Sequence, residues 1–216
     1  MYTLITDIVA LILEIIGTIA FSVSGAMAAI RAKLDVFGVV IVGCITACGG
    51  GILRDVLIGS FPPAIFSNFK IVMVGTFTAL MVFTMAYRHR KRYEELTEKI
   101  EYVNNVFDAI GLAAFTVMGT ELAFTAGIHE NIFLALTMGV LTGVGGGVIR
   151  DVLINTTPYI FKKHIYALAS LSGGVIYYAA RLFTVNPIVP SLVAMALVIS
   201  LRLLAAKYRW SLPKVS

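Results

Sequence analysis

The chain has 216 residues, of which 59% are hydrophobic and only 13% are charged. Soluble domains carry about 25% charged residues, so long apolar stretches with few charges indicate a membrane protein. The net charge of +5 does not indicate a nucleic-acid-binding protein, because the basic residues cluster between apolar stretches, where membrane orientation accounts for them. Cys44 and Cys48 lie one helical turn apart in one apolar stretch and imply no disulfide framework.

Seven apolar segments are each close to the roughly 20 residues that a helix needs to cross a membrane. In chain order they cover 7–30, 36–59, 69–87, 105–126, 131–154, 164–183 and 187–206. We predict an all-α membrane protein in which each of these segments is a transmembrane helix. The one long polar stretch, 88–104, carries mixed charges and is expected to form a solvated helical linker.

The distribution of Lys and Arg predicts the orientation in the membrane. With the N-terminus outside, only Lys70 and Arg181 lie on the outer side, while Arg54 and Arg150 lie within spans. The other basic residues fall on the inner side: Arg31, Lys33, Arg88, Arg90, Lys91, Arg92, Lys99, Lys162, Lys163, Arg202, Lys207, Arg209 and Lys214. We therefore expect an outside N-terminus and a cytoplasmic C-terminus.

The second half of the chain repeats the first. The stretch GGGILRDVLIG at 49–59 returns as GGGVIRDVLIN at 145–155, and GTIAFSVSG at 17–25 matches GLAAFTVMG at 111–119. Three spans per unit is an odd number, so the second unit enters the membrane from the opposite side, which predicts an inverted repeat. The expected units are a first three-helix repeat (1–87), a charged cytoplasmic linker (88–104), a second, inverted three-helix repeat (105–183) and a peripheral seventh helix with a short cytoplasmic tail (184–216).

Two glycine triplets interrupt the second and fifth predicted spans. A glycine in a helix interior costs about 1 kcal/mol relative to alanine, so three in a row predict a kink or a short unwound piece. Carbonyls freed there would suit a cation, because their oxygens can replace hydration water. The alternative is that the triplets only let helices pack closely. The residues are Gly49, Gly50 and Gly51, and Gly145, Gly146 and Gly147.

Four hydroxyl residues at repeat-matched positions are candidates for lining an ion path. Ser22 matches Thr116, and Thr46 matches Thr142 about one turn before each glycine triplet. The alternative is that these hydroxyl groups bond back to their own helices, as membrane Ser and Thr commonly do.

Six charged residues are expected to form an intramembrane network, since charges within a membrane usually face the protein interior and pair. They are Arg54, Asp55, Arg150, Asp151, Glu14 and Asp108. Neighbouring residues on a helix do not face each other. We therefore expect Arg54 to pair with Asp151 or Asp108, and Arg150 to pair with Asp55 or Glu14. These charges either hold the halves together or line the path.

The duplicated GGGxxRDVL motif lies in the second span of each of two inverted three-span units, and a seventh span follows them. This arrangement resembles that of the trimeric intracellular cation (TRIC) channels, in particular their prokaryotic members. The resemblance covers nearly the whole chain. It implies a homotrimer in a prokaryotic inner membrane, with one pore per subunit between the kinked second and fifth spans. That pore would pass K⁺ and other monovalent cations such as Na⁺, in contact with membrane lipid.

A second function remains open, because the same repeat is also the unit of a bacterial family labelled glycine transporters. An inverted repeat suits alternating access, so the alternative is a secondary transporter of a small zwitterion such as glycine. A zwitterion site needs both charges of an Arg-Asp pair free, whereas a channel more readily leaves them paired. No catalytic constellation, metal-ligand spacing or cofactor fingerprint is visible, so we expect neither an enzyme nor a cofactor or metal site.

Overall fold

The computed structural model describes residues 2–67, 69–162 and 165–210. Residue 164 of the sixth predicted span, residues 211–216 of the predicted tail, and Lys163 and Lys214 of the charge distribution lie outside the described residues. All regular structure in these ranges is helical: α1 (Tyr2–Arg31), α2 (Val36–Leu57), α3 (Ala64–Ser67), α4 (Phe69–Arg88), α5 (Arg90–Glu95), α6 (Thr97–Thr125), α7 (Ile132–Leu153), α8 (Tyr159–Lys162), α9 (Tyr166–Phe183) and α10 (Ile188–Lys207).

Six helices of the described part are long and apolar enough to cross a membrane: α1, α2, α4, α6, α7 and α10. The prediction of an all-α, multi-pass membrane protein is therefore confirmed. The predicted sixth span corresponds to α9, whose 18 residues fall outside this group of six. The predicted linker contains α5 and the first two turns of α6, which begins at Thr97 and so extends well before the predicted span.

The two glycine-containing helices begin in the same way. Asp35 precedes α2, and its side chain accepts a hydrogen bond from the Gly38 N–H at 2.8 Å. Asn131 precedes α7, and its side chain accepts from the Leu134 N–H at 3.0 Å. Such caps satisfy N–H groups that have no partner within the helix. Matching caps thus start α2 and α7 at matching points of the repeat.

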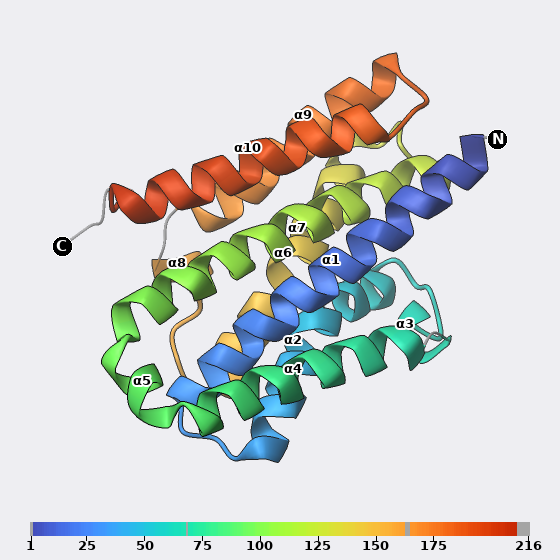
Figure 1. Ribbon diagram of the computed structural model, residues 1–216. Helices are drawn as coiled ribbons and strands as arrows, with labels where there is room; N and C mark the ends of the chain where they lie inside the picture. Colours follow the sequence, from blue (N-terminus) through green and yellow to red (C-terminus); the bar gives the residue numbers. More distant parts are fainter. Residues whose placement is uncertain (1, 68, 163–164, 211–216) are drawn as a thin grey trace.

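The helices form a central group with flanking helices on two sides (Figure 1). In the centre, α1 packs on α2 and α6, and α7 packs on α2 and α6. On one side, α4 covers α1 and α2; on the other, α9 covers α6 and α7, and α10 covers α6 and α9. The structure therefore places corresponding helices of the two sequence repeats in corresponding contacts.

The crossing of α1 and α6 follows from the matched stretches GTIAFSVSG and GLAAFTVMG. The ring of Phe115 occupies the space where a side chain on Gly17 would lie, and the ring of Phe21 fills that space at Gly111. The two ring centroids are 5.3 Å apart. Each glycine thus makes room for the phenylalanine of the other half, and both phenylalanines belong to one buried apolar cluster.

Candidate functional site

The glycine triplets lie where α2 crosses α7. A side chain on Gly50 would collide with the carbonyl oxygen of Thr142, and one on Gly146 would collide with the carbonyl oxygen of Thr46. A Cβ on Gly49 would lie 3.5 Å from the Cα of Gly146. The triplets therefore remove side chains at the point where the two backbones come closest, as small residues do at membrane helix crossings.

Of the predicted kink or short unwound piece, the unwound piece is wrong, because α2 and α7 are α-helical throughout the triplets. An unwound segment would leave carbonyl groups without partners, at a cost of several kcal/mol each in a lipid environment. The glycine propensity penalty of about 1 kcal/mol per residue is smaller than that cost. Close packing against the partner helix further favours the continuous helix.

Thr46 and Thr142 are buried beside this crossing. Each hydroxyl group donates to the carbonyl oxygen four residues earlier in its own helix, that of Val42 or Met138, at 2.6 Å. This is the back-bonding that the sequence left open as an alternative. The carbonyl oxygens of the same threonines contact Gly146 and Gly50, so both residues define the closest approach of α2 and α7.

Ser22 and Thr116 instead connect neighbouring helices. The Ser22 hydroxyl donates to the Gly75 carbonyl on α4 at 2.6 Å, and the hydroxyl groups of Thr116 and Ser170 on α9 are 2.6 Å apart. Ser22, Thr116 and Ser170 have no exposed surface. In this structure the two matched hydroxyl groups therefore fasten α4 and α9 to the central helices.

Arg54 and Asp55 pair with each other at the end of α2. The Nε and Nη2 of Arg54 lie 2.9 and 2.7 Å from the Asp55 Oδ1. The other carboxylate oxygen accepts the backbone N–H of Ala64, at the start of α3, at 2.9 Å. The expectation that adjacent Arg and Asp seek other partners is wrong here, because the long arginine side chain folds back onto its neighbour.

The second motif repeats this arrangement at the end of α7. The Nε of Arg150 donates to the Asp151 Oδ1 at 2.8 Å, and the Asp151 Oδ2 accepts the backbone N–H of Tyr159 at 2.8 Å. In both halves the aspartate thus joins its arginine to the short helix that follows. The aspartate of each motif therefore anchors the following short helix in addition to pairing with its neighbouring arginine.

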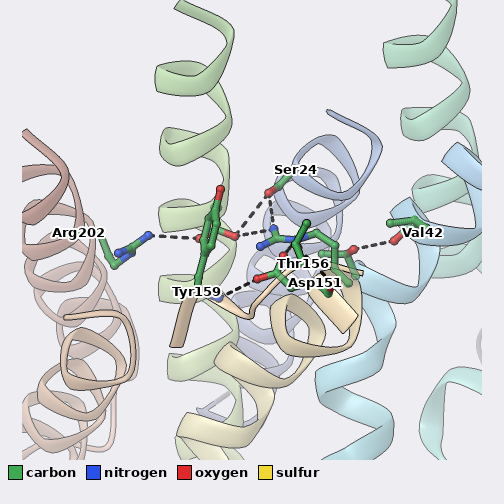
Figure 2. A network of polar contacts seen from close by, with 9 residues as sticks. Ser24, Val42, Asp151, Thr156, Tyr159 and Arg202 are labelled. Atoms are coloured by element: carbon green, nitrogen blue, oxygen red, sulfur yellow. Dashed lines mark hydrogen bonds and ion pairs between the residues drawn. The ribbon is translucent and has the colours of Figure 1, made fainter. Parts of the chain in front are cut away.

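Asp108 is the centre of a larger buried network around Arg150. The Nη1 of Arg150 donates to the Asp108 Oδ1 at 2.8 Å and to the Ser24 Oγ at 2.7 Å. Arg150 and Asp108 are 1% and 0% exposed, so the ion pair is fully removed from solvent. Figure 2 shows Ser24 and Arg202 approaching this network from opposite sides, with Asp151 close to Tyr159. The expected pairing of Arg150 with Asp55 or Glu14 is replaced by pairing within its own half, and Ser24 supplies the contact with the first half.

Arg202, which the charge distribution assigns to the inner side of the membrane, was not among the predicted members of this network. Arg202 lies on α10, is 3% exposed, and its Nη2 is 3.5 Å from the Asp108 Oδ2. Its guanidinium also stacks 4.5 Å from the centre of the Tyr166 ring. The expectation of a peripheral last helix is therefore incomplete, because α10 contributes a charge to the centre. The signal in the sequence was an arginine flanked by apolar residues on both sides, VISLRLLAAK.

A second missed cluster joins the ends of α6 and α9. Arg181 makes a two-pronged ion pair with Glu121, in which Nε donates to Oε2 and Nη2 to Oε1, both at 2.9 Å. The Tyr177 hydroxyl donates to the same Oε2 at 2.8 Å. Arg181, which the charge distribution assigns to the outer side of the membrane, thus joins α9 to α6.

The two Arg-Asp pairs have different surroundings. A cavity of about 60 Å³ lies beside Arg54 and Asp55, and its walls include Glu14, Gly51 and Thr142. Glu14 corresponds to Asp108 in the repeat and is half-buried. The two ends of the α2–α7 crossing thus differ: a small polar cavity adjoins one Arg-Asp pair, and a sealed charge network surrounds the other.

The model of the glycine-transporter family matches the chain twice, at residues 11–87 and 105–181. This chain belongs to that family. The two matched segments coincide with the two halves found in the sequence.

Family relatives span most of the chain. A UPF0126 inner membrane protein, YadS, of Escherichia coli is 34% identical over 202 residues, covering 93% of each chain. A UPF0126 membrane protein, YvgT, of Bacillus subtilis is 36% identical over 165 residues, covering 76% of this chain and 77% of the relative.

Solved structures extend the likeness to the fold. A prokaryotic TRIC channel crystallised in 0.5 M KCl has a TM-score of 0.82 and 34% identity, over 98% of this chain and 100% of the other. The TRIC orthologue from Rhodobacter sphaeroides has a TM-score of 0.82 and 29% identity, over 94% and 99%. The family member described here has the TRIC fold, which confirms the resemblance given by the duplicated motif.

Proposed function

We propose that this chain is a monovalent cation channel that conducts K⁺ and Na⁺ through one pore in each subunit of a homotrimer. The likeness to a prokaryotic TRIC channel over nearly the whole length of both chains is the observation that carries the proposal. The proposed location is a bacterial inner membrane, with the N-terminus outside, the C-terminus in the cytoplasm and seven membrane crossings that include α9. The excess of Lys and Arg on one side supports this orientation.

The proposed path runs between α2 and α7. It begins at the small cavity beside Glu14 and Arg54, passes the crossing of the glycine triplets, and ends near Asp108 and Arg150. The matched contacts of the two halves support a pseudo-two-fold relation between these ends, as in an inverted repeat. In this proposal the backbone contact at the crossing keeps the path closed, and conduction requires α2 and α7 to bend apart at the triplets.

The charges at the ends of this path suit gating by exchange of partners. Asp108 has two cationic neighbours, Arg150 at 2.8 Å and Arg202 at 3.5 Å. A carboxylate released by an arginine within the protein interior attracts a cation strongly, since its field is weakly screened there. Movement of Arg150 away from Asp108 would therefore free one oxygen of this carboxylate to attract a permeating cation at this end of the path.

The alternative is a secondary transporter of a small zwitterion such as glycine. The family model's description and the repeated half support it. A zwitterion site would need an unpaired guanidinium and an unpaired carboxylate to bind the two ends of its substrate. Both arginines of the motif are instead engaged with carboxylates, Arg54 with Asp55 and Arg150 with Asp151 and Asp108. This pairing favours the channel.

Reconstitution of the purified protein separates the two functions. In a planar bilayer with a KCl gradient, the channel predicts discrete openings whose reversal potential follows the K⁺ gradient. If the protein is a transporter, vesicles reconstituted with it should take up labelled glycine with saturable kinetics, and the planar bilayer should show no unitary currents. Saturable uptake in the absence of openings would replace the channel proposal with the transporter.

A further inference from the structure

The small cavity near the end of α2 differs from the corresponding place in the second half. Ile71 in its wall matches Tyr166, in the register that aligns PAIF at 63–66 with PYIF at 158–161. The ring of Tyr166 stacks against the guanidinium of Arg202 on α10, a helix that lies outside both repeats. The cavity therefore lies where the first half has neither a phenol ring nor a second arginine.

Glu14 contributes an unpaired carboxylate to this cavity. Its counterpart Asp108 is paired with Arg150 at 2.8 Å, whereas no hydrogen bond or ion pair joins Glu14 to another described residue. Arg54 attracts Glu14 electrostatically but is bonded to Asp55. The formal charges of the side chains in the wall are one positive and two negative, a net charge of −1. The cavity therefore favours a cation.

A second polar group in the wall has no partner. The hydroxyl group of Thr18 has no exposed surface and makes no hydrogen bond with the described residues. Thr18 follows Glu14 by one turn of α1, and both side chains line the cavity. The cavity volume of about 60 Å³ exceeds the roughly 10–15 Å³ that one water molecule needs. There is therefore room for a small ion together with water.

Two sulfur atoms indicate which kind of cation fits. Cys48 of α2 and Met118 of α6 both line the cavity, and both are half-buried. Their counterparts in the repeat, Val144 and Ser24, carry no sulfur. Thiolate and thioether ligands select soft ions such as Cu⁺, whereas oxygen ligands suit hard ions. Because the two sulfur atoms come from different halves of the chain, no ligand spacing in the sequence indicated a metal site.

We propose that this cavity binds one soft monovalent metal ion of the Cu⁺ and Ag⁺ class between the Cys48 sulfur and the Met118 thioether. The bond from the metal to Cys48 forms as the thiol loses its proton, and the Glu14 carboxylate accepts that proton. The thiolate then balances the charge of the metal ion, so the net charge of the cavity rises from −1 to zero. Water that enters with the ion gives the Thr18 hydroxyl group a partner. Metal binding is independent of whether the chain conducts ions or carries glycine.

Two single-cysteine chains test the site, because α2 carries a second thiol one turn away. The Sγ of this second thiol, Cys44, lies 3.2 Å from the Thr76 Oγ1 on α4. The variant Cys44→Ser keeps Cys48, and the variant Cys48→Ser keeps Cys44. Each purified full-length variant is titrated with Ag⁺ in detergent and chloride-free buffer, with free cysteine as the competitor. We expect one Ag⁺ per chain in Cys44→Ser, bound at least about tenfold more tightly than in Cys48→Ser.

Substitutions of the other wall residues test their separate roles. Met118→Leu keeps the apolar bulk and should weaken Ag⁺ binding about tenfold in the chain that keeps Cys48, but not in the chain that keeps Cys44. Glu14→Gln should also weaken binding in the chain that keeps Cys48, because it removes the proton acceptor and the negative charge.

Excess K⁺, added as nitrate, should not displace Ag⁺ from the chain that keeps Cys48. The proposal is overturned if the two single-cysteine chains bind Ag⁺ equally, or if Met118→Leu or Glu14→Gln leaves binding in the chain that keeps Cys48 unchanged. It is also overturned if K⁺ displaces Ag⁺, which would make the cavity a site for hard cations.

Discussion

Two adjacent glycines of α2 provide a matched test of the packing at the α2–α7 crossing. A methyl group on Gly50 would overlap the Thr142 carbonyl oxygen and lie 2.9 Å from the Thr142 carbonyl carbon. A methyl group on Gly51 would meet only the Arg54 Nη2, at 3.9 Å. We therefore expect Gly50→Ala to destabilise the protein and Gly51→Ala to be neutral or stabilising.

Comparing Gly50→Ala with Gly51→Ala isolates the free-energy cost of the steric collision at Gly50. Both substitutions gain the helix propensity of alanine, about 1 kcal/mol, so this contribution cancels between the two variants. What remains is the cost of forcing two backbones apart, typically about 1–3 kcal/mol for overpacking. For a chain of this size, about 2–4 °C of melting temperature corresponds to each kcal/mol, so the variants should differ by roughly 2–12 °C.

The assay is thermal unfolding of both purified variants in the same detergent. Gly146→Ala should behave as Gly50→Ala does, because its methyl group would overlap the Thr46 carbonyl oxygen. Equal melting temperatures for Gly50→Ala and Gly51→Ala would refute the close backbone contact at the crossing.

Three further outcomes follow from the charges and from the proposed assembly. Arg150→Ala should lower the free energy of unfolding by about 3–5 kcal/mol, because it leaves Asp108 and Asp151 buried without their main partner. Arg54→Ala should lower it less, because Arg54 and Asp55 lie beside a polar cavity. Equal losses of stability in thermal unfolding would contradict this difference. In a cysteine-free background, Ser60→Cys should react with an impermeant thiol reagent added outside and Glu101→Cys should not, and the reverse labelling would invert the proposed orientation. Mass measurement of the detergent complex should give three copies of the 23.3-kDa chain, and a monomer or dimer would count against the homotrimer.

Much of the fold could be predicted from the sequence because membrane helices have a strong local signal. Apolar length identified the six candidate spans, and the repeated motif indicated which parts of the two halves correspond. The effect of the glycine triplets was harder to predict. Helix propensity argued for a break in each span, but propensity is a local property, and the contact between Gly50 and the Thr142 carbonyl exists only once the two helices pack.

The charge network shows a second limit of the sequence. The types and positions of Arg150, Asp151 and Asp108 indicated an intramembrane cluster, which the structure forms. The partners could not be predicted from helix geometry alone, because a long arginine side chain reaches both its neighbour and another helix. Arg202 was missed because its closeness to the end of the last span made it resemble a loop cation, while its partner Asp108 lies 94 residues earlier.

Cations are proposed to pass between α2 and α7, and a substitution at position 51 tests this path most directly. Gly51 lines the cavity beside Arg54 and has room for a side chain. In a background without Cys44 and Cys48, single-channel recording of Gly51→Cys should show K⁺ openings that a small, positively charged thiol reagent blocks. The control Val56→Cys, on an exposed part of the same helix, should keep its current after the same treatment. Unchanged current in modified Gly51→Cys, or equal block of the control, would contradict a path between these two helices.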